Sequence, residues 1–136
     1  MFQNEVRNMC QSMMATGIFH DKGDAEAILR ASLLALRDRL PKLEAYRLGT
    51  HLPLELKDWY FENWRNDMRQ SESVNKSEFL AEVNYHLQGI EDYSLAELVP
   101  VAMKRILSVL SPEEASHIKQ LIPVSMRDIF DDRIEM

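Results

Sequence analysis

The chain has 136 residues, of which 46% are hydrophobic and 28% are charged, and this composition excludes a disordered tail, a fibrous repeat and a disulfide scaffold. Sixteen Lys and Arg residues stand against 22 Asp and Glu, so the net charge is −6 and we expect no nucleic-acid partner. The one cysteine, Cys10, cannot form an internal disulfide and is typical of a reducing compartment.

Targeting and membrane signals are missing from the sequence. The first residues lack the basic start and the long apolar run that a secretory signal needs. The longest uncharged stretches reach about half of a membrane-spanning helix. We therefore expect a cytoplasmic protein that does not bind a membrane.

Helical periodicity runs through the whole chain, whereas strand signals are nearly absent. Apolar residues recur three or four positions apart along Phe2–Met13, Ile28–Leu40 and Leu95–Leu110. Shorter helices are predicted over Lys42–Leu48, Pro53–Asn63, Lys76–Leu87, Pro112–Gln120 and Pro123–Asp131. The pattern predicts an all-α fold of about eight helices.

Several helix ends carry a local signature. Ser111-Pro112-Glu113-Glu114 predicts a capping box, in which the serine oxygen accepts a backbone N–H and Glu114 returns a bond to the Ser111 N–H. Asn75 and Ser94 begin weaker versions of this spacing. Gly49 is predicted to end its helix in a left-handed conformation. Pro100 predicts either a kink or the start of a helix.

The two halves of the chain align without a gap when the sequence is shifted by 70 residues, so that Asp24–Tyr60 meets Ser94–Phe130. Identical pairs are Leu40 and Leu110, Glu44 and Glu114, Ala45 and Ala115, Pro53 and Pro123, and Asp58 and Asp128. A single repeat of this size could not bury its apolar faces alone, so we predict two pseudo-symmetric helical repeats that share one core. One domain then spans residues 1–136, with repeat one at 1–64, a linker at 65–75 and repeat two at 76–136.

A longer motif covers the end of the second predicted helix and the two helices that follow it. It reads Leu33-x-x-Leu36-Arg37-Asp38-Arg39-Leu40-Pro41-x-x-Glu44-Ala45-x-x-Leu48-x-x-x-Leu52-Pro53, followed by Tyr60-Phe61-Glu62-Asn63-Trp64. This motif resembles the signature of domain-of-unknown-function family 2267, and Leu110–Pro123 is similar to that family's C-terminal half. The chain departs from the pattern at Thr50-His51, and Arg37 and Arg39 have no basic counterparts in the second copy. The resemblance implies an all-helical bacterial cytoplasmic protein and implies no activity.

Glu114 and His117 form the sharpest candidate for a metal site. Glu-x-x-His places two ligands on one helix face, as in di-iron carboxylate bundles, which need a second such pair. The aligned copy has Glu44 followed by Arg47, and an arginine cannot ligate a metal. We therefore favour the capping role for Glu114.

Other candidates for chemistry have simpler structural explanations. Glu78, Glu82 and His86 share one helix face, for which a solvated surface is the favoured interpretation. His20 and His51 have no partner at ligand spacing. Cys10 lies beside a core stripe with no basic residue closer than Arg7, which favours a buried structural cysteine over a nucleophile. We predict no catalytic residue, no metal and no cofactor.

Two sets of residues are candidates for contact with a partner. Phe61 and Trp64 are a candidate contact surface, because Trp59 and Tyr60 align with apolar residues and belong in the core. The favoured alternative is that Phe61 and Trp64 cap the junction between the repeats. The second set is basic and favours a salt-bridged surface over an anion site; it comprises Arg30, Arg37, Arg39, Lys42 and Arg47.

These observations predict a non-enzymatic helical module that binds a protein partner, its own copy or an apolar ligand between the repeats. The alternative is a metal-dependent enzyme that uses Glu114 and His117.

Overall fold

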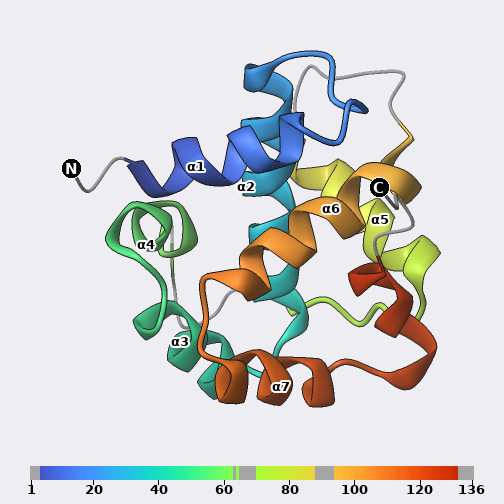
Figure 1. Ribbon diagram of the computed structural model, residues 1–136. Coiled ribbons are helices and arrows are strands. Elements are labelled where there is room, and N and C mark those ends of the chain that lie inside the picture. Colours follow the sequence, from blue (N-terminus) through green and yellow to red (C-terminus); the bar gives the residue numbers. More distant parts are fainter. Residues whose placement is uncertain (1–3, 63, 65–69, 88–93, 132–136) are drawn as a thin grey trace.

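Seven α-helices and one 3₁₀-helix form the described part of the computed structural model, which covers residues 4–62, 64, 70–87 and 94–131 and contains no strand in those ranges (Figure 1). The elements are α1 (Asn4–Met14), α2 (Lys22–Arg39), α3 (Lys42–Thr50), α4 (Leu54–Tyr60), α5 (Lys76–His86), α6 (Leu95–Ser108), α7 (Pro112–Leu121) and η1 (Val124–Phe130). The all-α prediction is confirmed. None of the helices in these ranges has both the length and the apolarity that a bilayer span requires.

The core is built on α2 and α6, which cross at the centre of the molecule (Figure 1). The predicted stripes point inward: Leu33 and Leu36 of α2 and Met103 and Ile106 of α6 are all fully buried. Burial of each such side chain stabilises the fold by about 1.5–3 kcal/mol. Val6, Met9 and Met13 of α1 are buried as predicted, and Phe2 lies outside the described residues.

The outer elements contact this central pair in a reciprocal pattern. Helix α1 packs against both α2 and α6, and so does α5. Helix α4 contacts α1 and α2, whereas η1 contacts α5 and α6. Helices α3 and α7 lie at one end of the molecule, at the bottom of Figure 1. Exchanging α1, α2 and α4 for α5, α6 and η1 leaves this set of contacts unchanged.

Two of the three predicted helix caps form. Ser111 Oγ accepts the Glu114 N–H at 3.1 Å, and Asn75 Oδ1 accepts the Glu78 N–H at 2.9 Å. Ser94 precedes α6 without a side-chain capping bond. These bonds satisfy N–H groups that have no partner within the first turn of a helix.

The prediction for Gly49 is wrong, because this residue does not end α3 in a left-handed conformation. Among the glycines in the described ranges, only Gly17 has a positive φ, of 82°. Gly49 lies inside α3, where a Cβ atom would come within 2.8 Å of Tyr60 Cδ2 and still closer to the Phe61 ring. The glycine is needed for the close approach of two aromatic rings rather than for a change in chain direction.

The structure excludes one of the two alternatives for Pro100 and changes the helix type predicted after Pro123. Pro100 lies buried inside α6, which starts at Leu95, so no helix begins at the proline. The segment predicted as a helix from Pro123 forms a 3₁₀-helix, in which the Met126 N–H donates to the Pro123 carbonyl at 2.9 Å. Its sequence, VSMRDIF, contains β-branched and short polar residues that favour an α-helix less than the LELKDWY of α4.

Candidate functional site

Arg37, near the C-terminal end of α2, is a buried side chain that holds the end of α4. Its side chain is 7% exposed, and Nη1 donates to the carbonyls of Tyr60 at 2.9 Å and Glu62 at 3.3 Å. The guanidinium therefore satisfies carbonyls that the last turn of α4 leaves without helical partners. The prediction of a surface position is wrong for Arg37, because the planar fork can serve several carbonyls inside the fold.

The other predicted basic residues lie nearer the surface. Arg30 forms an ion pair with Glu62, and Arg47 forms one with Glu114 at 3.1 Å, in agreement with the salt-bridge prediction. Arg39 instead donates from Nε to the Ser73 carbonyl at 2.6 Å.

Asp38 joins the end of α2 to the second half of the chain. Its carboxylate accepts the Arg37 Nε–H at 3.1 Å and lies 2.8 Å from His86 Nε2, at the end of α5. The Asp38 carbonyl accepts the Ser71 N–H at 2.7 Å. His86 is only 13% exposed, so the predicted solvated helix face is wrong for this residue. The described part of the predicted linker is thus tied to α2.

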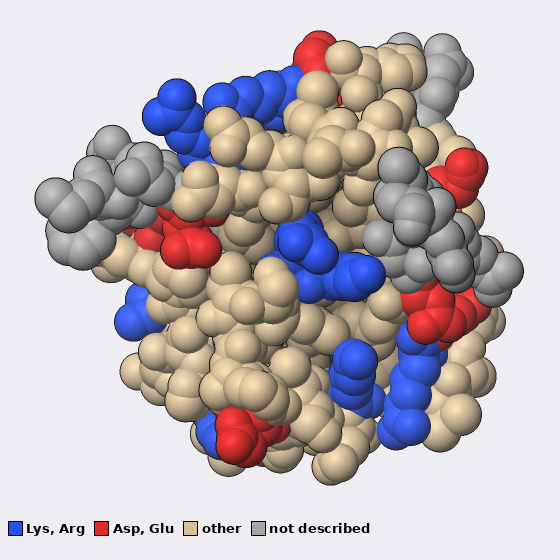
Figure 2. Space-filling model, in the orientation of Figure 1, with Lys and Arg blue, Asp and Glu red and all other residues tan. Residues whose placement is uncertain are grey.

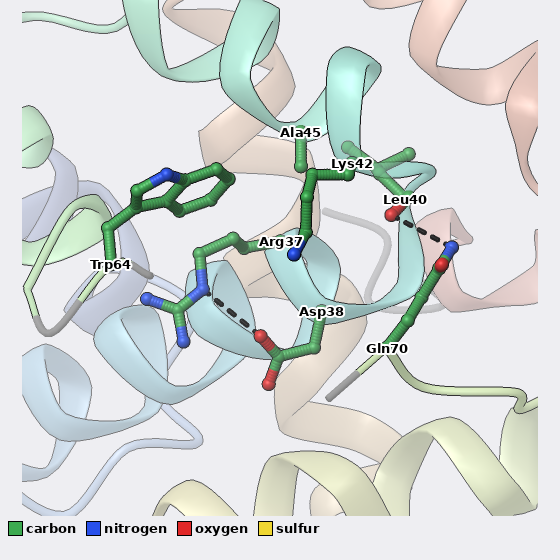
Figure 3. Close-up of a pocket in the computed structure, with 7 residues that line it drawn as sticks. All are labelled: Arg37, Asp38, Leu40, Lys42, Ala45, Trp64 and Gln70. Atoms are coloured by element: carbon green, nitrogen blue, oxygen red, sulfur yellow. Dashed lines mark hydrogen bonds and ion pairs between the residues drawn. The ribbon is translucent and has the colours of Figure 1, made fainter. Parts of the chain in front are cut away.

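A small hollow opens beside this hydrogen-bonded group, lined by Arg37, Asp38, Leu40, Lys42, Ala45, Trp64 and Gln70 (Figure 3). The Gln70 side-chain amide donates to the Leu40 carbonyl at 3.1 Å and closes one side. The interior measures about 20 Å³, which is enough for a single water molecule. Small-molecule pockets are usually larger than about 300 Å³, so the hollow does not have the size of a substrate pocket.

Aromatic rings from α3 and from the end of α4 pack together at the rim of the hollow. The ring centroids of Phe61 and Trp64 are 5.5 Å apart, and Tyr46 lies 5.7 Å from Phe61 and 6.3 Å from Trp64. Tyr60 anchors the group: its ring is fully buried, and its hydroxyl donates to the Ala45 carbonyl at 2.5 Å. Burial also raises the pKa of Tyr60 far above its usual range, which keeps this hydroxyl a donor.

Sequence reasoning placed Trp59 and Tyr60 in the core, and this is correct for Tyr60 alone. Trp59 is partly buried and packs against the edge of the core. Phe61 and Trp64, the predicted contact residues, are also partly buried against it. Their role in contact with a partner stays a prediction.

Leu43 and Tyr46 are exposed apolar residues that sequence reasoning missed. Leu43 is 85% exposed and Tyr46 is 55% exposed, on the outer face of α3. The 70-residue alignment held a signal for them, because it pairs Leu43 with Glu113 and Tyr46 with Ser116, which are polar. In Figure 2 the surface over α3, at the lower left, is largely uncharged apart from its lower edge. We call Leu43, Tyr46, Phe61 and Trp64 the α3–α4 surface.

Helices α3 and α7 are joined by ionisable side chains. Glu44 Oε1 lies 2.9 Å from His117 Nε2, and Arg47 Nη2 lies 3.1 Å from Glu114 Oε1. His51 Nε2 stands 3.9 Å from the same Glu114 oxygen. The capping box is therefore half formed: the Ser111 bond exists, but the Glu114 carboxylate is buried and turned towards Arg47.

The residues considered for metal binding or nucleophilic chemistry have structural partners. Within the described ranges, no three His, Cys, Asp or Glu side chains are arranged to hold a metal ion. Cys10 is 1% exposed, and burial together with Glu26 raises the pKa of its thiol to about 11. Such a thiol stays protonated near neutral pH and is a poor nucleophile. The prediction that Cys10 is buried is confirmed.

Comparison with known proteins identifies the family of the chain. A search of the curated proteins finds no match to the chain. The model of the family described as "Uncharacterized conserved protein (DUF2267)" matches residues 7–133, which is nearly the whole sequence. The chain therefore belongs to the DUF2267 family.

Proposed function

We propose that the chain is a non-enzymatic helical module that binds a protein partner through the α3–α4 surface. The observation that carries the proposal is the exposure of Leu43, at 85%, next to the half-exposed Tyr46 and the rings behind it. An exposed leucine alone needs no explanation, but one that adjoins a cluster of aromatic rings is typical of a contact site. Aromatic residues at such sites supply much of the binding free energy.

Rigid support for these side chains favours the same function. Phe61 packs against Gly49, where a side chain would not fit, and Tyr60 is held by its bond to Ala45. Arg37 fixes the backbone between Tyr60 and Glu62. A surface held in one conformation loses little conformational entropy when a partner binds.

The enzyme alternative has less support from the contacts. Glu114 and His117, its proposed ligands, face Arg47 and Glu44 respectively. The hollow beside Trp64 has room for a water molecule rather than a substrate. The engagement of Glu114 and His117 favours a binding module over an enzyme that uses these two residues as metal ligands.

The proposal includes one domain over residues 1–136, formed by two repeats related by an approximate twofold axis. The reciprocal contacts of the helices support it, because exchanging α1, α2 and α4 for α5, α6 and η1 leaves the contacts among these six elements unchanged. A bacterial, cytoplasmic setting is part of the proposal and is supported by the family resemblance and the single cysteine. The net charge of −6 supports a partner other than nucleic acid.

Affinity capture from a lysate of the native cell tests the function. The bait is the wild-type chain, with Leu43→Ser as the test variant and Val124→Ser as the control, because Val124 is 76% exposed on η1. We expect a protein retained by the wild type and the control and lost from the Leu43 variant. If the variants melt like the wild type and no captured protein depends on Leu43, the proposed function is wrong.

A further inference from the structure

We infer that the partner segment bound by the α3–α4 surface is acidic as well as apolar, with a carboxylate that pairs with Lys42. This inference rests on the proposed function and names the chemistry of its partner. It comes from the distribution of charge around the surface, which differs from that of the chain as a whole.

Lys42 supplies the cation next to the apolar surface. It is exposed, precedes Leu43 directly, and lines the hollow together with Trp64. Figure 3 shows Lys42 between Trp64 on one side of the hollow and Gln70 on the other. Within the described ranges, no ion pair joins Lys42 to a carboxylate. A partner side chain lying over Leu43 would bring its neighbouring residues within reach of this ammonium group.

Three carboxylates of α2, α3 and the end of α4 are already engaged with other groups of the chain, whereas Asp58 of α4 is exposed. Glu44 faces His117, and Asp38 faces both Arg37 and His86. Glu62, which follows the aromatic ring of Phe61, pairs with Arg30. Among the described residues of α3, the exposed charge next to Leu43 that no ion pair neutralises is therefore the positive charge of Lys42.

Arg47 strengthens this positive character. Its side chain remains 49% exposed although it pairs with Glu114, and it lies one residue after Tyr46 on α3. A partly exposed guanidinium can accept a second carboxylate through its remaining N–H groups. Lys42 and Arg47 thus flank the two exposed apolar side chains of α3.

A second copy of the chain fits this surface less well. In a symmetric dimer the same patch on each copy would face the other, which would bring the cations of both copies together. Like charges placed opposite each other oppose association. Charge complementarity therefore favours a different, acidic protein segment.

Two synthetic peptides test the inference. Both carry leucines spaced three and four residues apart, and the remaining positions are glutamate in one peptide and lysine in the other. The chain has two tryptophans, so Trp59→Phe leaves Trp64 as the sole tryptophan, and its fluorescence reports on the surface beside it. We expect the glutamate peptide to bind saturably, at least tenfold more tightly than the lysine peptide, with an affinity that falls as salt rises.

Charge reversal at one position provides the matched control. Lys42→Glu should lower the affinity for the glutamate peptide by roughly fivefold to tenfold. Lys119→Glu, an equal change of charge on the exposed face of α7, should leave this affinity unchanged. Equal affinity for both peptides, or equal effects of the two variants, overturns the inference. The two peptides could bind equally well and both lose binding in the Leu43→Ser variant. That result would contradict the acidic partner and would still support the proposed function of the α3–α4 surface. If neither peptide binds, the inference is wrong, and capture from the lysate with the Leu43 variant still decides the proposed function. A dimer that requires Leu43 in sedimentation would identify a second copy of the chain as the partner instead.

Discussion

Glu44 and His117 face each other between α3 and α7, with 2.9 Å between Oε1 and Nε2. Their counterparts in the 70-residue alignment are Glu114 and Arg47, which form the neighbouring pair at 3.1 Å. Each glutamate therefore contacts the residue that follows the other glutamate by three positions. Reciprocal contacts of this kind are what a twofold axis between two like units produces.

A second pair of contacts follows the same relation. Glu55 of α4 accepts the Val6 N–H at 3.0 Å, near the start of α1. Its aligned counterpart is Ser125 of η1, which donates to the Val74 carbonyl just before α5. In both halves, the same aligned position ties the last helical element to the start of the first.

A double-mutant cycle on Arg47 and Glu114 should give a coupling of about 0.5–1 kcal/mol, because Arg47 is half exposed to solvent. The exchange variant R47H/H117R should keep its free energy of unfolding within about 0.5 kcal/mol of the wild type, since it moves each side chain to the equivalent site. Chemical denaturation measures both quantities. A loss above about 2 kcal/mol in the exchange variant would contradict the twofold relation.

The helix caps predict a graded response to alanine. Ser111→Ala and Asn75→Ala should each cost about 1 kcal/mol, because each removes a bond to an N–H of the first helical turn. Ser94→Ala should stay within about 0.5 kcal/mol, because Ser94 makes no side-chain capping bond. Thermal melts of the three variants test the order, and equal losses would show that the Ser94 cap forms in solution.

Arg37 should tolerate substitution poorly. Arg37→Lys should lower the free energy of unfolding by about 2–4 kcal/mol, because one ammonium group cannot serve the carbonyls of Tyr60 and Glu62 together with Asp38. Arg7→Lys, on the exposed face of α1, should stay within about 0.5 kcal/mol and serves as the control. Denaturant titration measures the free energy of unfolding of both variants. If Arg37→Lys lowers it as little as Arg7→Lys does, Arg37 does not have the buried role described above.

Cys10 predicts a loss of stability in alkaline solution. Burial raises the pKa of its thiol from 9.0 to about 11, so between these values the unfolded chain releases a proton that the folded chain retains. The contribution is fully present below pH 9 and is lost as the pH rises towards 11. From pH 8 to pH 10 the wild type should lose about 1 kcal/mol more than Cys10→Ala. Parallel losses in the two proteins, measured by denaturation at both pH values, would show that Cys10 is not the cause.

The sequence by itself determined the helical class, the main core stripes and two of the helix starts. These features depend on residues three or four positions apart, such as Leu33 with Leu36 or Ser111 with Glu114, so they can be seen in a short window of sequence. The sequence also held the signal for Leu43 and Tyr46, because the aligned copy has polar residues at these positions, but the aromatic run at the end of α4 is the stronger local pattern.

Only the tertiary structure decided what the charged and aromatic side chains do. Arg37 reaches carbonyls 23 and 25 residues away, Asp38 meets His86 across 48 residues, and Glu44 meets His117 across 73. Local pattern cannot separate a solvated charge from one that holds a distant backbone group, because both occupy a polar position on a helix. Gly49 is a similar case, since the rings that exclude a side chain there come from a different helix end.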